Sequence, residues 1–346
     1  MANLQRQFNQ FHEAIRLNQE QVNLRERRER ILTRLRDSLA RHFNGSGKPV
    51  PRFEPFNQGS YAMNTGVKPL DGDYDIDVGL RFHVSKSSGD YENPVALKKL
   101  VYEMIQNHTQ DVHLKRPCVT VNYVGDYHVD LAIYASSEWN DGTDFLARGF
   151  LGSSEDNREW QPSDPRAFIK RVNQYSDEVR ERDQFRRIVR YLKRWKDHRF
   201  SSNGNAAPVG IGLTISALSH LTPQFDPFDN ATPRDLKALV GLVEAMCSQF
   251  RRVYHEGEYA RRIEGLMPVV PHDDVYARMS NRQMSQFEAR LKELLEVCND
   301  ALQEPDPHEA AKLLVPQFGD DFPVPKPGDG ALRTGASAII TTSTSA

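Results

Sequence analysis

The sequence predicts an α+β fold, on three observations. An amphipathic helical pattern covers residues 24–39, short β-type runs follow between residues 53 and 134, and mostly helical patterns fill residues 168–302. Strands gathered in one part of a chain and helices in another are typical of α+β proteins. With 346 residues, of which 38% are hydrophobic and 27% charged, the chain can bury a sizeable core in one large or two ordinary domains.

Composition excludes several classes of protein. No run approaches the ~18 to 20 apolar residues that a membrane-spanning helix needs, and the first ten residues lack the apolar core of a signal peptide. We therefore expect a cytoplasmic protein with no membrane partner. The three cysteines are scattered without paired spacing, which argues against a disulfide framework or a zinc site. At a net charge of -2, affinity for polyanions would need a local basic patch.

The predicted N-terminal helix is long and amphipathic. Leu24, Ile31, Leu35 and Leu39 recur at intervals of seven, four and four residues, and arginines fill many positions between them. The sequence NGSGKPVP at residues 44–51 ends this helix, because glycines and prolines break regular structure.

Three β-type runs follow, at residues 76–84, 119–124 and 127–134. The last two flank Gly125 and Asp126, and a glycine at the first central position suits a type II′ turn. We therefore expect these two runs to form an antiparallel pair.

The second half of the chain is predicted to be mainly helical. The polar stretch at residues 136–165 predicts a loop or lobe connection. The final residues, 331–346, are small, polar and uncapped, which predicts a disordered tail. Helical patterns occupy residues 168–198, 210–221, 233–254 and 280–302.

Four aspartates crowd into seven residues: Asp71, Asp73, Asp75 and Asp77. Their spacing does not fit an EF-hand loop, which needs glycine at its sixth position and glutamate at its twelfth. A strand fits instead, because residues two apart share a face, so Asp75 and Asp77 point away from the apolar Ile76. Adjacent carboxylates repel unless a divalent cation neutralises them, and magnesium favours carboxylates completed by water and phosphates.

A third carboxylate comes from YHVDLAIY at residues 127–134. Val129, Leu131 and Ile133 alternate with the other residues, which places Asp130 on the opposite face. The alternative is the exposed face of an edge strand. Three carboxylates on neighbouring strands can hold two metal ions ~3.5 to 4 Å apart, an arrangement that suits phosphoryl transfer.

Gly59 and Ser60 precede the acidic cluster. The segment YAMNT after them can begin a helix, and a helix N-terminus with free N–H groups and a hydroxyl binds anions such as a triphosphate. The same dipeptide also suits an ordinary turn. Its place before the Asp-x-Asp strand and the later strand Asp favours phosphate binding.

These motifs, GSYAMNT, YDIDVGL and HVDLAIY, resemble the cGAS/DncV-like nucleotidyltransferases of bacterial CBASS antiphage systems, within the DNA polymerase β-like superfamily. RRIVRYLKRWKDHRF is similar to the helix in which this superfamily carries a lysine two residues before a tryptophan, here Lys193 and Trp195. FGDDFP at residues 318–323 resembles a segment that closes the helical lobe over the nucleotide, with Asp320 as a contact. The resemblance extends from the N-terminal helix to about residue 323.

The resemblance implies an α+β architecture of two lobes. A polymerase β-like nucleotidyltransferase lobe, with a mixed β-sheet and the long N-terminal helix, would pack against a C-terminal helical lobe across the active site. The implied boundaries are residues 1–165 for the catalytic lobe, 166–330 for the helical lobe and 331–346 for a flexible tail.

The resemblance also implies a reaction. A magnesium-dependent nucleotidyl transfer would make a cyclic di- or trinucleotide from ribonucleoside triphosphates, with ATP among them. Asp75, Asp77 and Asp130 are the implied ligands of two Mg²⁺ ions, with Mn²⁺ as a substitute, and Asp130 would help to remove the proton of the attacking hydroxyl. The implied nucleotide contacts are Gln58, Gly59, Ser60, Lys193 and Asp320.

Several alternatives stay open. Lys193 lies among other basic residues and can simply solvate a helix face. Where relatives offer a serine at the start of the next helix, this chain has AAPVGIG. The zinc-binding insertion of the animal DNA sensor has no counterpart, which argues against activation by DNA through that route. The product can also be linear, as in oligoadenylate synthesis or RNA tailing, or the fold can be a non-catalytic nucleotide-binding module.

The chain ends at Ala346. Some relatives in antiphage operons have their C-terminus joined to another molecule by a ubiquitin-like ligation system, so the resemblance implies ligation or regulatory operon partners for this tail. A frayed terminus without a function is the alternative.

Overall fold

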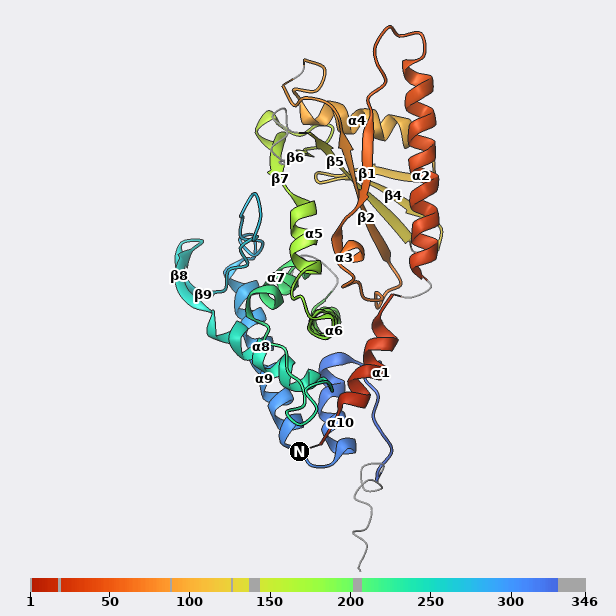
Figure 1. Cartoon of the computed structure of the whole chain (residues 1–346). Helices are drawn as coiled ribbons and strands as arrows, with labels where there is room; N and C mark the ends of the chain where they lie inside the picture. The colour runs from red at the N-terminus through yellow and green to blue at the C-terminus, as the bar shows by residue number, and fades with distance from the viewer. Residues whose placement is uncertain are drawn as a thin grey trace, which may run out of the picture.

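The computed structural model describes residues 2–17, 20–87, 89–125, 127–136, 144–201 and 207–328. It confirms the α+β class, with a mixed sheet in one region and most helices in another (Figure 1). The helices are α1 (Gln5–Ile15), α2 (Glu20–Phe43), α3 (Gly59–Ala62), α4 (Pro94–Ile105), α5 (Pro165–Asn173), α6 (Val179–Arg199), α7 (Gly210–His220), α8 (Asp235–Ser248), α9 (Asn281–Gln303) and α10 (Pro307–Phe318). The strands are β1 (Phe53–Asn57), β2 (Tyr74–Phe82), β3 (Asp111–Leu114), β4 (Val119–Tyr123), β5 (Tyr127–Ala135), β6 (Asp144–Arg148), β7 (Glu159–Ser163), β8 (Arg251–His255) and β9 (Glu258–Arg262).

One mixed sheet carries β1 to β7. Its strands follow the order β1-β2-β5-β4-β3, while β6 pairs with the end of β5 and with β7. The central strands β2 and β5 are parallel, and the other pairs are antiparallel. Parallel neighbours need a crossover connection, which here includes α4. The register of this central pair decides which polar residues of β2 and β5 can meet.

Helices α2 and α4 cover one face of this sheet (Figure 1). The four aliphatic residues that predicted α2 are all buried in the same core as Ile76 and Val78 of β2. Since successive residues of a strand point to opposite faces, Asp75 and Asp77 point away from this core.

A second hydrophobic core lies among α1 and α5 to α10. Phe8 and Phe11 of α1 contact Tyr191 of α6, with ring centroids 5.2 and 5.3 Å apart. Phe318 and Phe322 pack in the same cluster. Although α1 precedes α2 in the sequence, it therefore packs with the helical region. The lobe boundaries given above remain a prediction.

The predicted pairing of residues 119–124 with 127–134 is confirmed, because β4 and β5 are antiparallel. The predicted turn type is wrong. Tyr123 lies opposite Tyr127, so the connection has three residues rather than the two of a type II′ turn, and Gly125 adopts a φ of 91°. Asp126 lies outside the described residues.

The prediction that residues 136–165 form a loop is wrong in part, because β6 and β7 form an antiparallel hairpin within this range, while its place as a lobe connection stays a prediction. The sequence analysis missed this hairpin because its strands contain many polar residues. Asp144 is buried in β6 and accepts a hydrogen bond from Nε of Arg81 in β2, at 2.7 Å. A paired charge can thus take an inward position that a simple pattern reserves for apolar residues.

Two predicted helices differ from the structure. The pattern at residues 168–198 forms α5 and α6, because Ser176 Oγ accepts the N–H of Glu178 and so competes with helical pairing between them. The pattern at residues 233–254 ends at Ser248 and is followed by the β8–β9 hairpin. The turn between β8 and β9 is formed by Glu256 and Gly257, whose φ values of 52° and 83° are positive, as tight hairpin turns favour.

The helices predicted at residues 210–221 and 280–302 are confirmed as α7 and α9. The tail at residues 331–346 lies outside the described residues. None of the described helices combines the length and the apolar composition that a membrane crossing requires.

Candidate active site

The two central strands bring the predicted carboxylates together. Asp77 of β2 lies directly opposite Asp130 of β5 in the parallel register, and Asp75 lies opposite His128. Strand β5 pairs with β4 on its other side, so it is an interior strand. The edge-strand alternative for Asp130 is therefore wrong.

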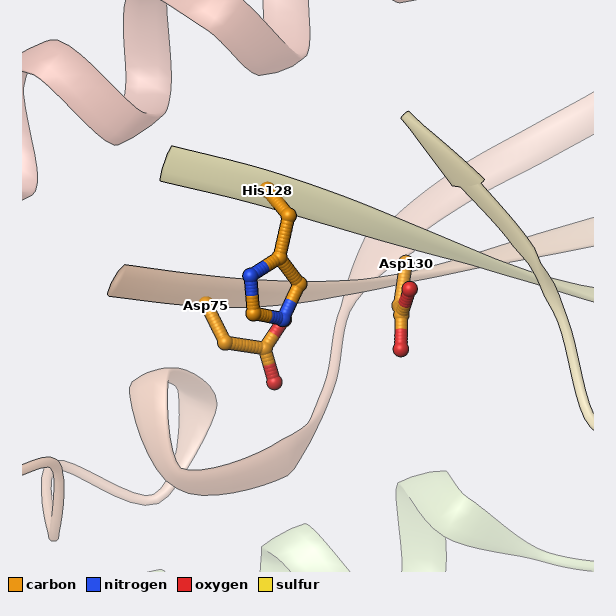
Figure 2. Close-up of side chains that lie close together, drawn as sticks. All are labelled: Asp75, His128 and Asp130. Carbon is orange, nitrogen blue, oxygen red and sulfur yellow. The ribbon is translucent and has the colours of Figure 1, made fainter. Parts of the chain in front are cut away.

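A histidine joins this cluster. One ligand atom from each of Asp75, His128 and Asp130 can be chosen so that all three lie within 4.8 Å of one another (Figure 2). His128 Nδ1 lies 2.8 Å from Oδ1 of Asp73, and its Nε2 lies 3.2 Å from Oδ1 of Asp75. The sequence analysis missed His128 as a site residue, although its position two residues before Asp130 places both on one face of β5.

The cluster is electrostatically unfavourable as a set of free carboxylates. Enclosure by the protein, followed by the charges of Asp77 and Asp130, raises the pKa of Asp75 to about 8. Enclosure, followed by the charge of Asp130, raises the pKa of Asp77 to about 6. The side chain of Asp75 nevertheless keeps 42% of its surface exposed, so an ion can reach it. Such a set fits a divalent cation, which would relieve the repulsion between its oxygens.

Asp130 is held by a neighbouring strand. The buried hydroxyl of Thr120 in β4 donates a hydrogen bond to Oδ1 of Asp130. Thr120 lies directly opposite Asp130 in the antiparallel register, so the pairing of β4 with β5 fixes this contact. The bond fixes one carboxylate oxygen of Asp130.

The Gly59-Ser60 turn is built against the same cluster. Gly59 begins α3 with a φ of 63°, a conformation that favours glycine. A Cβ at this position would lie 1.8 Å from Oδ2 of Asp77, so only glycine allows the close approach. The N–H of Gln58 donates to the carbonyl of Asp77 at 3.0 Å, and the Tyr134 hydroxyl donates to Oε1 of Gln58 at 3.0 Å. This turn is therefore part of the site's construction and not a detached surface turn.

Lys193 is buried, which overturns the reading of a solvated helix face. Its Nζ donates to the carbonyl and to Oγ1 of Thr65, at 3.0 and 3.1 Å. Burial, followed by the charges of Lys196 and Arg190, lowers the pKa of Lys193 to about 7. Lys193 therefore spans from α6 to the loop that follows α3.

Arg190, one helical turn before Lys193, holds the same loop. Its Nε donates to the carbonyl of Gly66 at 3.1 Å, and a terminal nitrogen donates to the carbonyl of Asn64 at 2.6 Å. Two cations of α6 thus bind three successive carbonyls, at residues 64–66. The sequence analysis missed Arg190 and Thr65, because no local pattern reveals contacts between segments more than a hundred residues apart.

The remaining predicted nucleotide contact lies at the end of α10. Asp320 is exposed, while its neighbour Asp321 pairs with Arg194 of α6 at 3.3 Å. The segment is anchored by Phe322, which is buried. Among the described contacts, none joins Asp320 to the carboxylate cluster, so its contact with a nucleotide remains a prediction.

The start of α7 adjoins Lys193. A Cβ on Gly210 would lie 3.8 Å from Cε of Lys193. As the sequence indicated, neither Val209 nor Gly210 supplies a hydroxyl there. Any phosphate contact at this helix start would have to come from the backbone.

The comparisons with known proteins point in one direction. Residues 51–134, which include β1, α3 and the aspartate-bearing strands, match the family model described as cyclic GMP-AMP synthase DncV-like, nucleotidyltransferase domain. A cyclic GMP-AMP synthase of Escherichia albertii is 26% identical over 171 residues, which cover 47% of this chain and 36% of that protein. A c-di-GMP synthase of Roseivirga ehrenbergii is 25% identical over 190 residues, covering 47% of this chain and 48% of that protein. The matched segment therefore spans less than half of either relative.

The fold is similar over nearly the whole chain. The crystal structure of the apo form of DncV from Vibrio cholerae superposes with a TM-score of 0.71, at 17% sequence identity. The superposition covers 93% of this chain and 96% of that one. The helical region, which the family model does not cover, thus shares the architecture of that protein as well.

Proposed function

We propose that this chain, which is similar to the cGAS/DncV-like nucleotidyltransferases, joins ribonucleoside triphosphates, ATP among them, into a cyclic di- or trinucleotide. One observation carries the proposal. Three aspartates gather on one polar face of two adjacent parallel strands, directly beside the turn that holds Gly59 and Ser60. A nucleotidyltransferase needs this juxtaposition, because metal ligands and phosphate contacts must serve the same triphosphate.

Asp75, Asp77 and Asp130 would hold two Mg²⁺ ions, and Mn²⁺ would substitute for them. Bound there, the ions supply neutralisation of the triphosphate charge and activation of the attacking hydroxyl. The donor set fits, because its carboxylate oxygens are the ligands that magnesium prefers. His128, which lies against Asp73 and Asp75, would hold the Asp75 carboxylate in place while the site is free of cations.

The phosphate contacts come from α3 and α6. The N–H groups at the start of α3 and the hydroxyl of Ser60 would donate to the β- and γ-phosphates, while the Gln58 side chain stays bound to Tyr134. Lys193 would turn its Nζ from Thr65 toward the same phosphates. Asp320 would contact the nucleotide from the helical side.

The proposed step breaks one bond and forms one. The sugar hydroxyl oxygen of the acceptor attacks the α-phosphorus of the donor, and the bond from that phosphorus to the β-phosphate oxygen breaks. Asp130, held by its hydrogen bond from Thr120, takes part in removing the hydroxyl proton. Pyrophosphate leaves, with Lys193 offsetting its charge. A second turn of the same reaction on the linear intermediate closes the ring.

The finer biological setting is also part of the proposal. The family resemblance supports a cytoplasmic role in antiphage defence. It supports residues 1–165 and 166–330 as catalytic and helical lobes. It also supports regulation through residues 331–346, by ligation of Ala346 or by operon partners. Removal of residues 331–346 should leave the basal activity of the purified protein largely intact, while recovery of only unmodified protein from cells with the complete operon would count against ligation.

The test is an incubation with all four ribonucleoside triphosphates and magnesium, followed by phosphatase treatment and mass analysis. The proposal predicts a product that resists phosphatase, because a ring has no terminal phosphate, and whose mass equals two or three nucleotides. A ladder of phosphatase-sensitive linear products would establish the linear synthase instead. Absence of any product with added magnesium or manganese would favour a non-catalytic nucleotide-binding module.

A further inference from the structure

The β8–β9 hairpin carries two cross-strand pairs of arginines. In its register Arg251 lies opposite Arg262, and Arg252 lies opposite Arg261. Like charges directly opposite each other in an antiparallel pair destabilise it. The hairpin lies at the outer side of the helical region, away from β2 and β5 (Figure 1).

The repulsion between Arg252 and Arg261 is offset by contacts that each of them makes. On one face of the hairpin, the guanidinium of Arg252 lies 4.9 Å from the ring centroid of Tyr259. Arg261 forms an ion pair with Glu288 of α9 at 2.8 Å. This pair has a partner for each of its charges.

Arg251 and Arg262 have no ion-pair or aromatic partner of this kind among the described contacts. Arg262 is only 7% exposed, and its guanidinium donates to Oδ1 of Asn281 and to the carbonyl of Tyr276, at 3.1 and 3.3 Å. Arg251 donates only to the backbone carbonyls of Ser248 and Phe250. Within the described part of the chain, neither arginine forms an ion pair with a carboxylate. Arg251 is exposed, but Arg262 is a buried cation bound only to neutral groups, which is costly, so an anion beside Arg262 would be stabilising.

Arg251 and Arg262 line the same cavity, of about 640 Å³, between the hairpin and α7. Its walls also carry Ser219, His220 and Gln249, whose side chains form no hydrogen bonds within the residues that the structure describes. Ile215 and Ile263 add apolar surface. A concave site with apolar walls and a few convergent polar groups is typical of small-molecule binding sites, and its volume lies in their usual range of roughly 300 to 1,000 Å³.

The cavity lining also carries two acidic residues, and neither forms an ion pair with Arg251 or Arg262 among the described contacts. Asp274 uses its Oδ1 to accept the N–H groups of Gly265 and Tyr276, at 2.8 and 2.9 Å. Glu264 also lines the cavity but is exposed. Among the described residues, neither carboxylate is thus an ion-pair partner of Arg251 or Arg262, and an anionic ligand can supply that partner.

We propose that this cavity is a second ligand site, outside the catalytic machinery, for a small organic phosphate whose phosphate group sits between Arg251 and Arg262. Two guanidinium groups match the charge of a phosphate group, about -1.5 to -2 at neutral pH, and their planar forks suit its oxygens. The apolar walls, together with Ser219 and His220 of α7 and Gln249 just after α8, would contact the organic part. None of the residues that line this cavity belongs to the candidate active site.

The test uses adenosine monophosphate and inorganic phosphate as probes, in chloride buffer with EDTA. Thermal unfolding and calorimetric titration are measured on the full chain and on Arg251→Met. Arg252→Met, on the opposite face of the same strand, is the matched control. Arg262 is left unchanged, because its bonds to Asn281 and Tyr276 hold the local fold.

Without phosphate, Arg251→Met should unfold at the same temperature as the wild type or higher, because the substitution removes repulsion. Adenosine monophosphate should raise the unfolding temperature of the wild type and of Arg252→Met, and its affinity for Arg251→Met should fall at least tenfold. It should also bind the wild type more tightly than inorganic phosphate does. Equal affinity of the wild type and Arg251→Met for adenosine monophosphate overturns the site. Equal affinity of the wild type for both probes overturns its assignment to an organic phosphate.

Discussion

The two sides of the candidate active site differ in how completely their charges are compensated. On the sheet, Asp75, Asp77 and Asp130 are packed together, and the pKa values of the first two are raised. On α6, Lys193 is buried and Arg190 is half-buried, and both donate to carbonyls of the loop at residues 64–66. The anionic side therefore needs a cation from outside, whereas the cationic side is already held in position by the protein.

The difference in charge compensation between the sheet and α6 suggests two different roles for their charged residues. In this proposal the crowded carboxylates favour a metal because their free state is unfavourable, whereas Lys193 is held near the site by its hydrogen bonds to Thr65. We therefore expect substitutions on the sheet to act on metal binding and on chemistry. Substitutions on α6 should act on nucleotide affinity.

The largest expected effect comes from removing charge on the sheet. Asp75→Asn, Asp77→Asn and Asp130→Asn should each reduce product formation by roughly three orders of magnitude or more, because a bound metal supplies several kcal/mol of transition-state stabilisation. The measurement is pyrophosphate release at saturating magnesium, with circular dichroism to confirm folding. Near-normal turnover by any one variant would remove that residue from the metal site.

The second largest effect is expected from Gly59→Ala, which should lower the stability of the fold. The added Cβ would lie 1.8 Å from Oδ2 of Asp77, at a φ of 63°, so the backbone strain and the clash together should cost about 2 to 5 kcal/mol of unfolding free energy. Denaturant unfolding and metal titration measure the two consequences.

Gly45→Ala is the matched control for this substitution. Gly45 has a φ of 76° with no atom near its Cβ position, so it carries the strain without the clash. Equal losses of stability in the two variants would show that the contact between Gly59 and Asp77 does not matter.

Lys193→Ala should weaken nucleotide use by about 1.5 to 3 kcal/mol, or roughly 10- to 150-fold, because a charge-assisted contact to phosphate is lost. Metal binding should stay unchanged. Lys196→Ala serves as the control, since Lys196 pairs with Asp197 at 2.8 Å and does not bind the loop at residues 64–66. An unaltered nucleotide titration for Lys193→Ala would leave this lysine only its structural bond to Thr65.

The smallest expected effect is a dependence of stability on pH in the absence of metal. Asp75 binds a proton more tightly in the folded chain, where its pKa is about 8, than in the unfolded chain, where it is 3.8. The free energy of unfolding should therefore fall as pH rises between these values, and Asp75→Asn should remove that part of the fall.

Urea unfolding in EDTA at pH 5 and pH 8 measures this effect. Relative to the wild type, Asp75→Asn should gain about 1 kcal/mol more at pH 8 than at pH 5, a modest value because solvent screens a side chain that is 42% exposed. The same difference at both pH values would argue against repulsion among the carboxylates.

Local patterns predicted much of this molecule. The aliphatic spacing of α2 and the alternation in β2 and β5 gave elements that the structure confirms, and with them the shared face of the three aspartates. Helix α4 was missed, although Asn93 caps its N-terminus and Pro94 occupies its first turn, which are signals that the sequence carries.

The rest depends on contacts between distant segments. His128 enters the cluster only because β2 and β5 pair in parallel with Asp75 opposite it. The hairpin of β6 and β7 depends on the pairing of Asp144 with Arg81 in β2. The sequence places His128 on the same face of its strand as Asp130, but neither the partner strand nor its register is encoded in a local period, so the contact of His128 with Asp75 and the pairing of Asp144 with Arg81 could not be derived from the sequence.

The central claim, that the carboxylate face is a metal centre for nucleotidyl transfer, is tested most directly by counting bound metal. Electron paramagnetic resonance can titrate Mn²⁺ into the full chain in the presence of a non-hydrolysable ATP analogue. The account predicts two bound ions for the wild type, and the loss of both from the double substitution of Asp75→Asn with Asp77→Asn. Equal Mn²⁺ binding by the wild type and the double variant would contradict it.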